Sequence, residues 1–92
     1  MKFEWNQDKA KNNLSKHKVS FEEAKTVFDD PFFIDFFDPD HSDEEDMFII
    51  VGQSHQNRLL IVSFTERSNT IRLISAREVT PIEKDDYEKG RD

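Results

Sequence analysis

Two β-rich runs separated by four polar residues constrain the fold of this chain more than any other feature. The first run, RLLIVSFT, begins at Arg58, and the second, TIRLISAR, ends at Arg77. Two such runs with a short polar connection predict a β-hairpin, in which Ser68 and Asn69 form the two-residue turn. The first run is apolar on both faces, which is typical of a strand in the middle of a sheet that is covered on each side. We therefore expect the chain to fold around this hairpin.

The hairpin carries four arginines: Arg58, Arg67, Arg72 and Arg77. With the turn at 68–69, Arg72 faces Thr65 across the ladder. One interpretation is a hairpin with solvated ends and one arginine whose stem lies along apolar surface. The other is a rigid platform that presents planar, permanently charged groups to a phosphate or a carboxylate. Arg72 and Arg77 are an odd number of positions apart, so they share a face only if the strand ends or bulges after Ser75.

The rest of the chain predicts the element order βααββββα. Besides the hairpin, we expect strands over 2–5, 32–37 and 47–52, and helices over 7–17, from 21 up to Pro31, and over 82–89. Helix starts are indicated by three capping patterns: Asn6, Ser20 with Glu23 in a capping box, and Thr80 followed by Pro81. For FFIDFF at 32–37 we expect core packing on at least one face, although its phenylalanines also suit a partner surface.

Length and composition limit the classes of protein. A chain of 92 residues is large enough for one small domain, which we expect to span 1–92. It has no cysteine, so neither a disulfide nor a thiolate metal site is possible. No apolar run approaches the roughly 18–20 residues of a membrane span, and the first residues, MKFEWNQDK, do not resemble a signal peptide. We therefore expect a cytoplasmic protein without a membrane partner.

The net charge of −7 is concentrated in one acidic block, residues 29–46, which holds nine Asp or Glu and no Lys or Arg. Of the 20 acidic residues, the other eleven stand against 13 lysines and arginines. This weakly basic remainder permits an anionic ligand. The missing basic stripe and recognition helix count against direct DNA binding.

The acidic block also raises the question of a metal site. It contains DPDHSDEED, which lacks the glycine of an EF-hand loop and has no helix behind it. A solvated loop that repels anions, or that docks a basic partner, fits the pattern better. Motifs of serine nucleophiles, P-loops and dinucleotide sites are absent, since Gly52 and Gly90 are the only glycines. We expect neither a metal nor a cofactor.

General acid–base chemistry has more candidates. Along the first helix, one polar stripe is formed by Lys9, Asn13, Lys16 and His17. The stripe suits an anion, or is a solvated helix face with a partly buried asparagine. RNA is cleaved without a metal when its 2′-OH attacks the phosphorus, which needs a base, a proton donor and cations around the phosphorane. His17, Glu66, Tyr87 and the arginines have the required chemistry, although a single histidine at a helix end is more often structural.

Several motifs together resemble the BrnT-type toxins of bacterial type II toxin–antitoxin systems. They are FEW with Lys9, Asn13 and Lys16-His17, then TER at 65–67, IRLISAR at 71–77, and Glu83 with Tyr87. The resemblance covers 3–90 and implies a RelE-like α+β fold, with two N-terminal helices and one C-terminal helix on an antiparallel β-sheet. It also implies a metal-independent endoribonuclease that inhibits translation. The implied partners are an RNA substrate and a cognate BrnA-like DNA-binding antitoxin, through which alone the protein reaches DNA.

The resemblance turns the candidate residues into a predicted site. The expected catalytic residues are His17, Glu66, Arg67, Arg72 and Arg77, and the expected RNA-binding residues are Lys9, Lys16, Arg58 and Tyr87. In this scheme the arginines bind the phosphate, His17 or Glu66 moves protons, and the lysines steer the RNA. The chain departs from the family pattern at three positions, since the family usually has Asp at Asn6 and Gly at Lys18, and often has Arg at Met47. Met47 leaves open an alternative, a catalytically weakened module that binds an antitoxin and acts as co-repressor.

Overall fold

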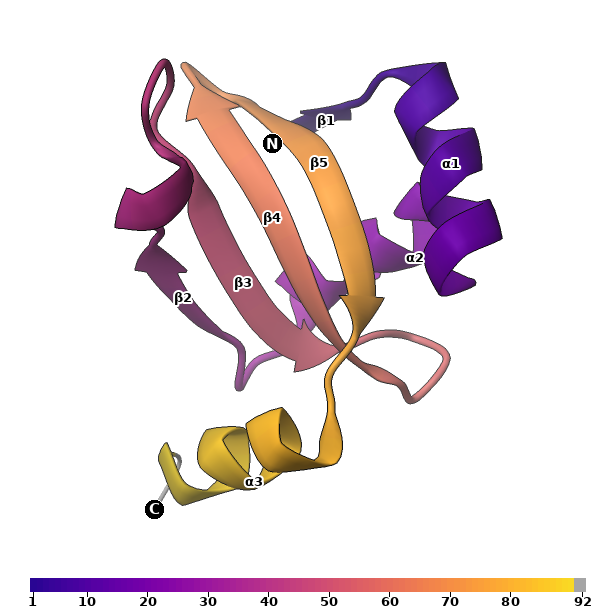
Figure 1. The fold of residues 1–92 in the computed structure, drawn as a ribbon, viewed down its shortest axis with the longest axis vertical. Coiled ribbons are helices and arrows are strands. Elements are labelled where there is room, and N and C mark those ends of the chain that lie inside the picture. Colours follow the sequence, from indigo (N-terminus) through magenta and orange to yellow (C-terminus); the bar gives the residue numbers. More distant parts are fainter. Residues whose placement is uncertain (91–92) are drawn as a thin grey trace.

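The predicted hairpin forms the centre of the sheet in the computed structural model, which describes residues 1–90 (Figure 1). Its strands are β4 (Leu59–Arg67) and β5 (Thr70–Glu78). Arg67 pairs with Thr70, so Ser68 and Asn69 make the turn, and Ser68 has the left-handed φ of 54° that such turns use. Thr65 pairs with Arg72 as expected.

The other elements follow in the expected order βααββββα. They are β1 (Lys2–Glu4), α1 (Gln7–His17), α2 (Phe21–Lys25) with the 3₁₀ turn η1 (Thr26–Asp29), β2 (Ile34–Phe37), the 3₁₀ turn η2 (Pro39–His41), β3 (Phe48–Gln53) and α3 (Pro81–Gly90). The strand order across the sheet is β1-β5-β4-β3-β2. The expected antiparallel sheet needs one correction, because β1 runs parallel to β5 and the sheet is mixed. The sequence of a three-residue strand does not indicate whether it runs parallel or antiparallel to its neighbour. That direction depends on the path of the two helices that follow β1.

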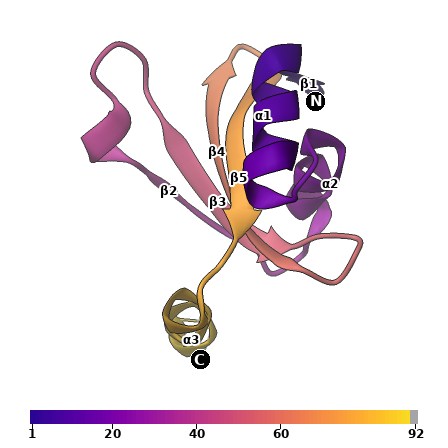
Figure 2. The same cartoon turned by 45° about the vertical axis from the view of Figure 1, so that its right-hand side comes forward.

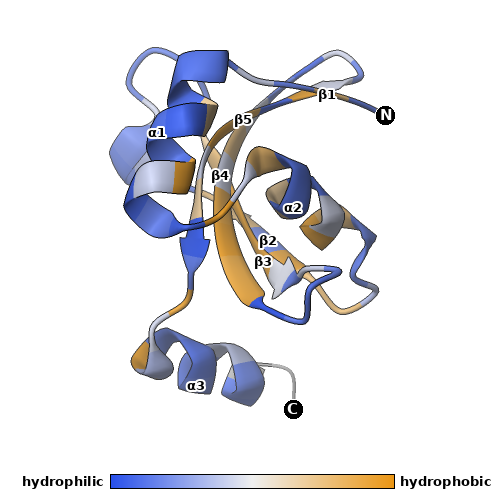
Figure 3. Cartoon of the chain, turned by 90° about the vertical axis from the view of Figure 1, so that its right-hand side faces the viewer, coloured by the Kyte–Doolittle hydropathy of each residue, from blue (hydrophilic) through white to orange (hydrophobic). Residues whose placement is uncertain are grey.

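Helix α2 lies on one face of the sheet, whereas α1 stands beside the edge of β5 (Figure 1 and Figure 2). Figure 3 shows that α2 and β4 carry hydrophobic residues, whereas α1 is mostly hydrophilic. The buried core is formed by Val19, Phe21, Ala24, Val27, Ile50, Leu60, Val62, Phe64, Ile71, Leu73 and Ala76. The prediction that both faces of β4 are covered was wrong, because Leu59, Ile61 and Ser63 on its other face are only half-buried. We refer to this second face as the open face.

A β-bulge in β5 decides which side chains reach the open face. Ser63 pairs with Ser75 and Phe64 pairs with Leu73, which leaves Ile74 without a partner on β4. The extra residue reverses the alternation, so that Arg72, opposite Thr65, and Arg77, opposite Ile61, share the open face. We expected the two arginines to share a face only if β5 ended or bulged after Ser75, and the bulge lies at Ile74 instead.

Local signals fix the ends of α1. The Asn6 side chain accepts hydrogen bonds from the backbone N–H groups of Asp8 and Lys9, as expected of an N-cap. At the other end, Lys18 takes the left-handed conformation, with φ 60° and ψ 30°, and its backbone N–H donates to Leu14. A lysine therefore occupies the position that favours glycine.

Strand β2 differs most from expectation. Core packing was expected on at least one face, but all four residues are exposed. Phe37 contacts Phe48 edge to face at 5.8 Å and still exposes 47% of its surface. The expectation failed because β2 is the outermost strand of the sheet, so only one strand, β3, lies beside it (Figure 1).

Helix α3 lies beyond the end of β5 (Figure 1). Its start is a capping box, in which Thr80 Oγ1 accepts from the Glu83 N–H and the Glu83 carboxylate accepts from the Thr80 N–H. The Tyr87 hydroxyl donates to the Phe32 carbonyl at 3.0 Å, which ties the helix to the segment before β2. Within residues 1–90, none of the helices has the length and apolar character to cross a membrane.

Candidate active site

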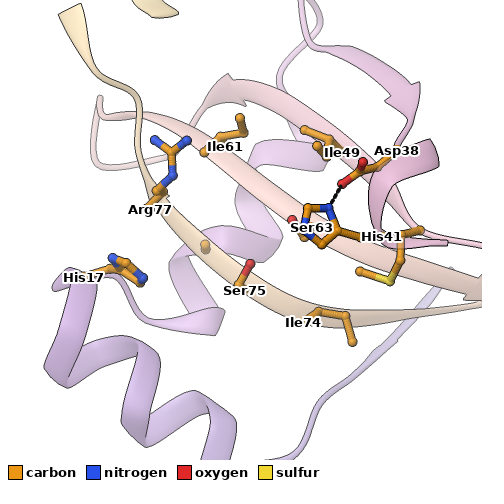
Figure 4. A pocket seen from close by; sticks show the side chains of 11 residues that line it. His17, Asp38, His41, Ile49, Ile61, Ser63, Ile74, Ser75 and Arg77 are labelled. Carbon is orange, nitrogen blue, oxygen red and sulfur yellow. Dashed lines mark hydrogen bonds and ion pairs between the residues drawn. The ribbon is translucent and has the colours of Figure 1, made fainter. Parts of the chain in front are cut away.

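A pocket of about 410 Å³ lies on the open face (Figure 4). His17 and Arg77, from α1 and β5, stand on one side of it, and Asp38 and His41, from the η2 turn, stand on the other. Met47, just before β3, also lines it. The remaining lining residues come from the central strands: Ile49, Ile61, Ser63, Ile74, Ser75 and Ala76. Polar groups on two walls over a partly apolar floor are typical of a ligand site.

Asn13 explains how His17 reaches this pocket. Its side-chain amide donates to the carbonyls of Val19 and Ala76, at 2.9 and 2.8 Å, and its Oδ1 accepts from the Ala76 N–H. These buried bonds hold the last turns of α1 against β5. His17 is four positions after Asn13 on the same side of the helix, and Arg77 directly follows Ala76. The polar stripe expected along α1 is therefore anchored by its asparagine.

Arg77 is held in a fixed orientation. Two of its nitrogens donate to the two Glu83 carboxylate oxygens, each at 2.8 Å, and one also donates to the Glu78 carbonyl at 3.2 Å. The hydrogen bonds from Arg77, followed by that from the Thr80 N–H, lower the pKa of Glu83 to about 2. The same pair raises the pKa of Arg77. A guanidinium has five N–H donors, so donors remain for a second anion.

The other predicted catalytic residues lie towards the hairpin turn and do not line this pocket. Arg72 pairs with Glu4 at 2.5 Å, and Arg67 pairs with Glu45 at 2.6 Å. Both arginines share the open face with Arg77. Glu66 pairs with the buried Ile71, so it belongs to the opposite face. The structure thus gathers the three arginines on one face and separates Glu66 from them.

Arg58, a predicted RNA-binding residue, is engaged inside the protein. It forms an ion pair with the buried Glu23, donates to the Lys18 carbonyl at 3.0 Å, and pairs with Glu78 at 2.8 Å. Arg58 is the main cause of the lowered pKa of Glu23. The prediction of a capping box at Ser20 is half right, because Ser20 caps the Glu23 N–H while the Glu23 carboxylate turns to Arg58 and Ser54.

The remaining RNA-binding candidates divide between surface and interior. Lys9 and Lys16 are exposed on α1, on the side of the helix that carries Asn13. Tyr87 exposes only 6% of its surface, in α3. The roles assigned to all these residues remain predictions.

Sequence reasoning missed His41 and Asp38 as pocket residues. Both lie in the acidic block, whose composition is typical of a solvated loop. Its sequence does not indicate that η2 lines a pocket together with His17, at the C-terminal end of α1. The available signal was local, since Asp38 and His41 are spaced three apart within DPDH. Within residues 1–90, no cluster of three or more His, Cys, Asp or Glu side chains is arranged to hold a metal ion.

A family model and a solved structure match this chain. A family model described as "Ribonuclease toxin, BrnT, of type II toxin-antitoxin system" matches residues 5–83. A crystal structure of the Brucella abortus ribonuclease toxin, BrnT, superposes with a TM-score of 0.64 over 87% of this chain and 97% of that one, at 18% identity. That identity supports a shared fold alone. Among curated protein sequences, no significant match was found.

Proposed function

The chain belongs to the BrnT family of ribonuclease toxins from type II toxin–antitoxin systems, and from this we propose that it cleaves RNA without a metal ion and thereby inhibits translation. The observation that carries the proposal is that His17 and Arg77 line the same pocket on the open face. We assign this role to residues 1–92 as a single toxin domain in the cytoplasm.

The proposed reaction uses the RNA's own 2′-OH as nucleophile. Arg77 contacts the scissile phosphate with the donors that Glu83 leaves unused and stabilises the charge that develops on it. His17 transfers a proton at the reacting oxygens. Lys9 and Lys16 attract the RNA along α1, while Arg67 and Arg72, on the same face as Arg77, contact its phosphates towards the hairpin turn.

The test is cleavage of a mixed RNA substrate by purified protein in the presence of EDTA. We expect wild type to cut, and Arg77→Ala to lose about 10²–10³-fold in rate because it lacks the phosphate contact. Glu83→Gln is the matched control, since it also breaks the Arg77–Glu83 ion pair but keeps the guanidinium. Equal losses in the two variants would show that Arg77 matters only for the position of α3. Activity that disappears with EDTA and returns with Mg²⁺ would contradict metal independence.

Met47 favours the alternative, a weakened toxin that serves as an interaction module and co-repressor. Its half-buried side chain lines the same pocket as His41, at a position where the family often has an arginine. Met47→Arg places a cation at this wall. A gain in RNA cleavage supports a weakened enzyme, whereas a well-folded Met47→Arg variant without activity supports the module.

The family implies an antitoxin partner, and we propose that a BrnA-like DNA-binding antitoxin docks on β2 and is the only route to DNA. Phe32, Phe33, Ile34, Phe36 and Phe37 expose between 38% and 61% of their surface. They lie within the acidic block, which holds no Lys or Arg. Pairing of β2 with a second copy would bring two acidic blocks together, so a basic, partly apolar partner is favoured.

Phe36→Ser tests this docking surface. We expect it to weaken antitoxin binding at least tenfold while RNA cleavage by the toxin alone is unchanged. Leu14→Ser is the control, because Leu14 has nearly the same exposure, 51% against 48%, but lies on α1. Calorimetry that gives the same Kd for both variants and wild type would exclude β2 as the docking site.

A further inference from the structure

His41 stands across the pocket from His17 and Arg77 (Figure 4). Resting on the proposed function, we infer that His41 is a second catalytic residue, which Asp38 orients, so that RNA is cleaved between two histidines. The reaction needs two proton transfers, and His17 carries out one of them. His41 supplies the other.

The turn that carries His41 is closed by hydrogen bonds within residues 38–47. Asp38 Oδ1 accepts from the Asp40 N–H, while the Asp38 N–H donates to the Met47 carbonyl at 2.8 Å. The Ser42 hydroxyl donates to the Asp38 carbonyl at 2.6 Å and accepts from the Met47 N–H at 2.9 Å. These bonds close residues 38–47 into a loop whose two ends meet at the start of β3. The backbone that carries His41 is therefore held beside the start of β3.

Asp38 also determines how the imidazole of His41 is used. His41 Nδ1 lies 2.9 Å from Asp38 Oδ2. A carboxylate oxygen only accepts, so Nδ1 carries the hydrogen. Nε2 is then the nitrogen that accepts a proton from substrate when the ring is neutral, or donates one when it is charged. A carboxylate that fixes the tautomer of a histidine is the arrangement found in hydrolytic triads.

The two histidines together supply both proton transfers of the cleavage step. One removes the proton from the 2′-OH as that oxygen bonds to phosphorus, and the other gives a proton to the 5′-oxygen as the P–O5′ bond breaks. The products are a 2′,3′-cyclic phosphate and a 5′-hydroxyl. The charged or titratable groups that line the pocket with His41 are Asp38, His17 and Arg77. Residues 43–46, which follow His41 in the chain, add four carboxylates.

His55 is a natural control, because it is the third and last histidine of the chain. Its Nε2 lies 3.7 Å from the Asp29 carboxylate, so it too has an acidic neighbour. It does not line the pocket. A histidine with a carboxylate neighbour is therefore present both inside and outside the proposed site.

The first test measures RNA cleavage against pH for wild type and four single variants. We expect His17→Ala and His41→Ala each to lose about 10²–10⁴-fold in kcat and one limb of a bell-shaped profile. His55→Ala keeps the wild-type rate and profile. Asp38→Asn preserves a good cap for η2 and is expected to lower kcat with little change in KM. A His41→Ala variant that cleaves at the wild-type rate with both limbs overturns the inference but leaves the proposed ribonuclease standing.

The second test does not depend on catalysis. Uridine 3′-monophosphate is titrated into the protein while the ring resonances of the three histidines are followed by NMR. We expect the signals of His17 and His41 to shift together with one Kd, and that of His55 to stay in place. Shifts of His17 alone, or of neither, overturn the inference. Shifts of both in a protein that cleaves no RNA support the two-histidine site and remove the proposed function.

Discussion

At the scale of single residues, Lys18 shows a local conflict between sequence and backbone. It follows α1 in the left-handed conformation, which costs a residue with a Cβ about 1–2 kcal/mol. We predict that Lys18→Gly stabilises the folded protein by about 1 kcal/mol, measured as a shift in the midpoint of urea unfolding. Lys11→Gly, in the interior of the same helix, should destabilise by a similar amount. If Lys18→Gly also destabilised the protein, the left-handed conformation at position 18 would not be a source of strain.

Arg58 was expected to bind RNA because of its charge, but it stabilises the fold by pairing with a buried glutamate. Removing it leaves the buried carboxylate of Glu23 without its main partner. We predict that Arg58→Ala destabilises the fold by about 3 kcal/mol, as measured by chemical denaturation. Arg67→Ala, which breaks the exposed pair with Glu45, should leave the unfolding midpoint nearly unchanged. Adding Glu23→Gln to Arg58→Ala should recover part of the loss, because no buried charge then remains.

At the scale of elements, α3 is attached to the rest of the domain by few contacts. Among residues 81–89 of this helix, Tyr87 is the buried one, and its hydroxyl bonds to the Phe32 carbonyl. We predict that Tyr87→Phe costs about 1 kcal/mol in the local stability of α3. Hydrogen exchange of the α3 amides should become faster while exchange in β4 stays the same. Equal acceleration in both elements would mean that α3 unfolds only together with the sheet.

The elements were predictable from sequence where the signal is local. The hairpin turn, the cap at Asn6 and the order of strands and helices follow from turn chemistry and periodicity. The direction of β1, the exposure of β2 and the partner of Glu23 were not predictable, because each depends on which distant segment lies alongside. In the candidate site, His17 and Arg77 came from motif and chemistry. His41 required the path of the η2 turn, which residues in an acidic loop do not reveal.

At the scale of the whole molecule, acid should weaken the fold through carboxylates that are ionised in ion pairs. The pKa of Glu83 is lowered to about 2, and that of Glu23 is also lowered. A carboxyl with a lowered folded pKa stabilises the protein above its unfolded pKa of about 4.3, and this contribution is lost as pH falls towards the folded pKa. We predict that the melting temperature falls between about pH 4.5 and pH 2, and that Glu83→Gln makes this fall smaller.

A matched comparison distinguishes this linkage from a general effect of charge. Glu45→Gln also removes one carboxylate and breaks one ion pair, in this case with the exposed Arg67. It should leave the slope of melting temperature against pH close to that of wild type. Identical slopes for Glu83→Gln and wild type would contradict the role assigned to the Arg77–Glu83 pair.

The bulge at Ile74 has a consequence for how a chain of this kind tolerates changes in length. Deleting this one residue leaves Arg77 in the sequence but removes the half-step that turns it to the open face. Either Arg77 then points into the apolar core, or the whole of β5 slides along β4 and the turn at 68–69 is remade. The surface loop at 38–46, whose ends meet, accommodates an inserted or missing residue far more easily. The number of residues is therefore constrained more strictly in strand β5 than in the surface loop.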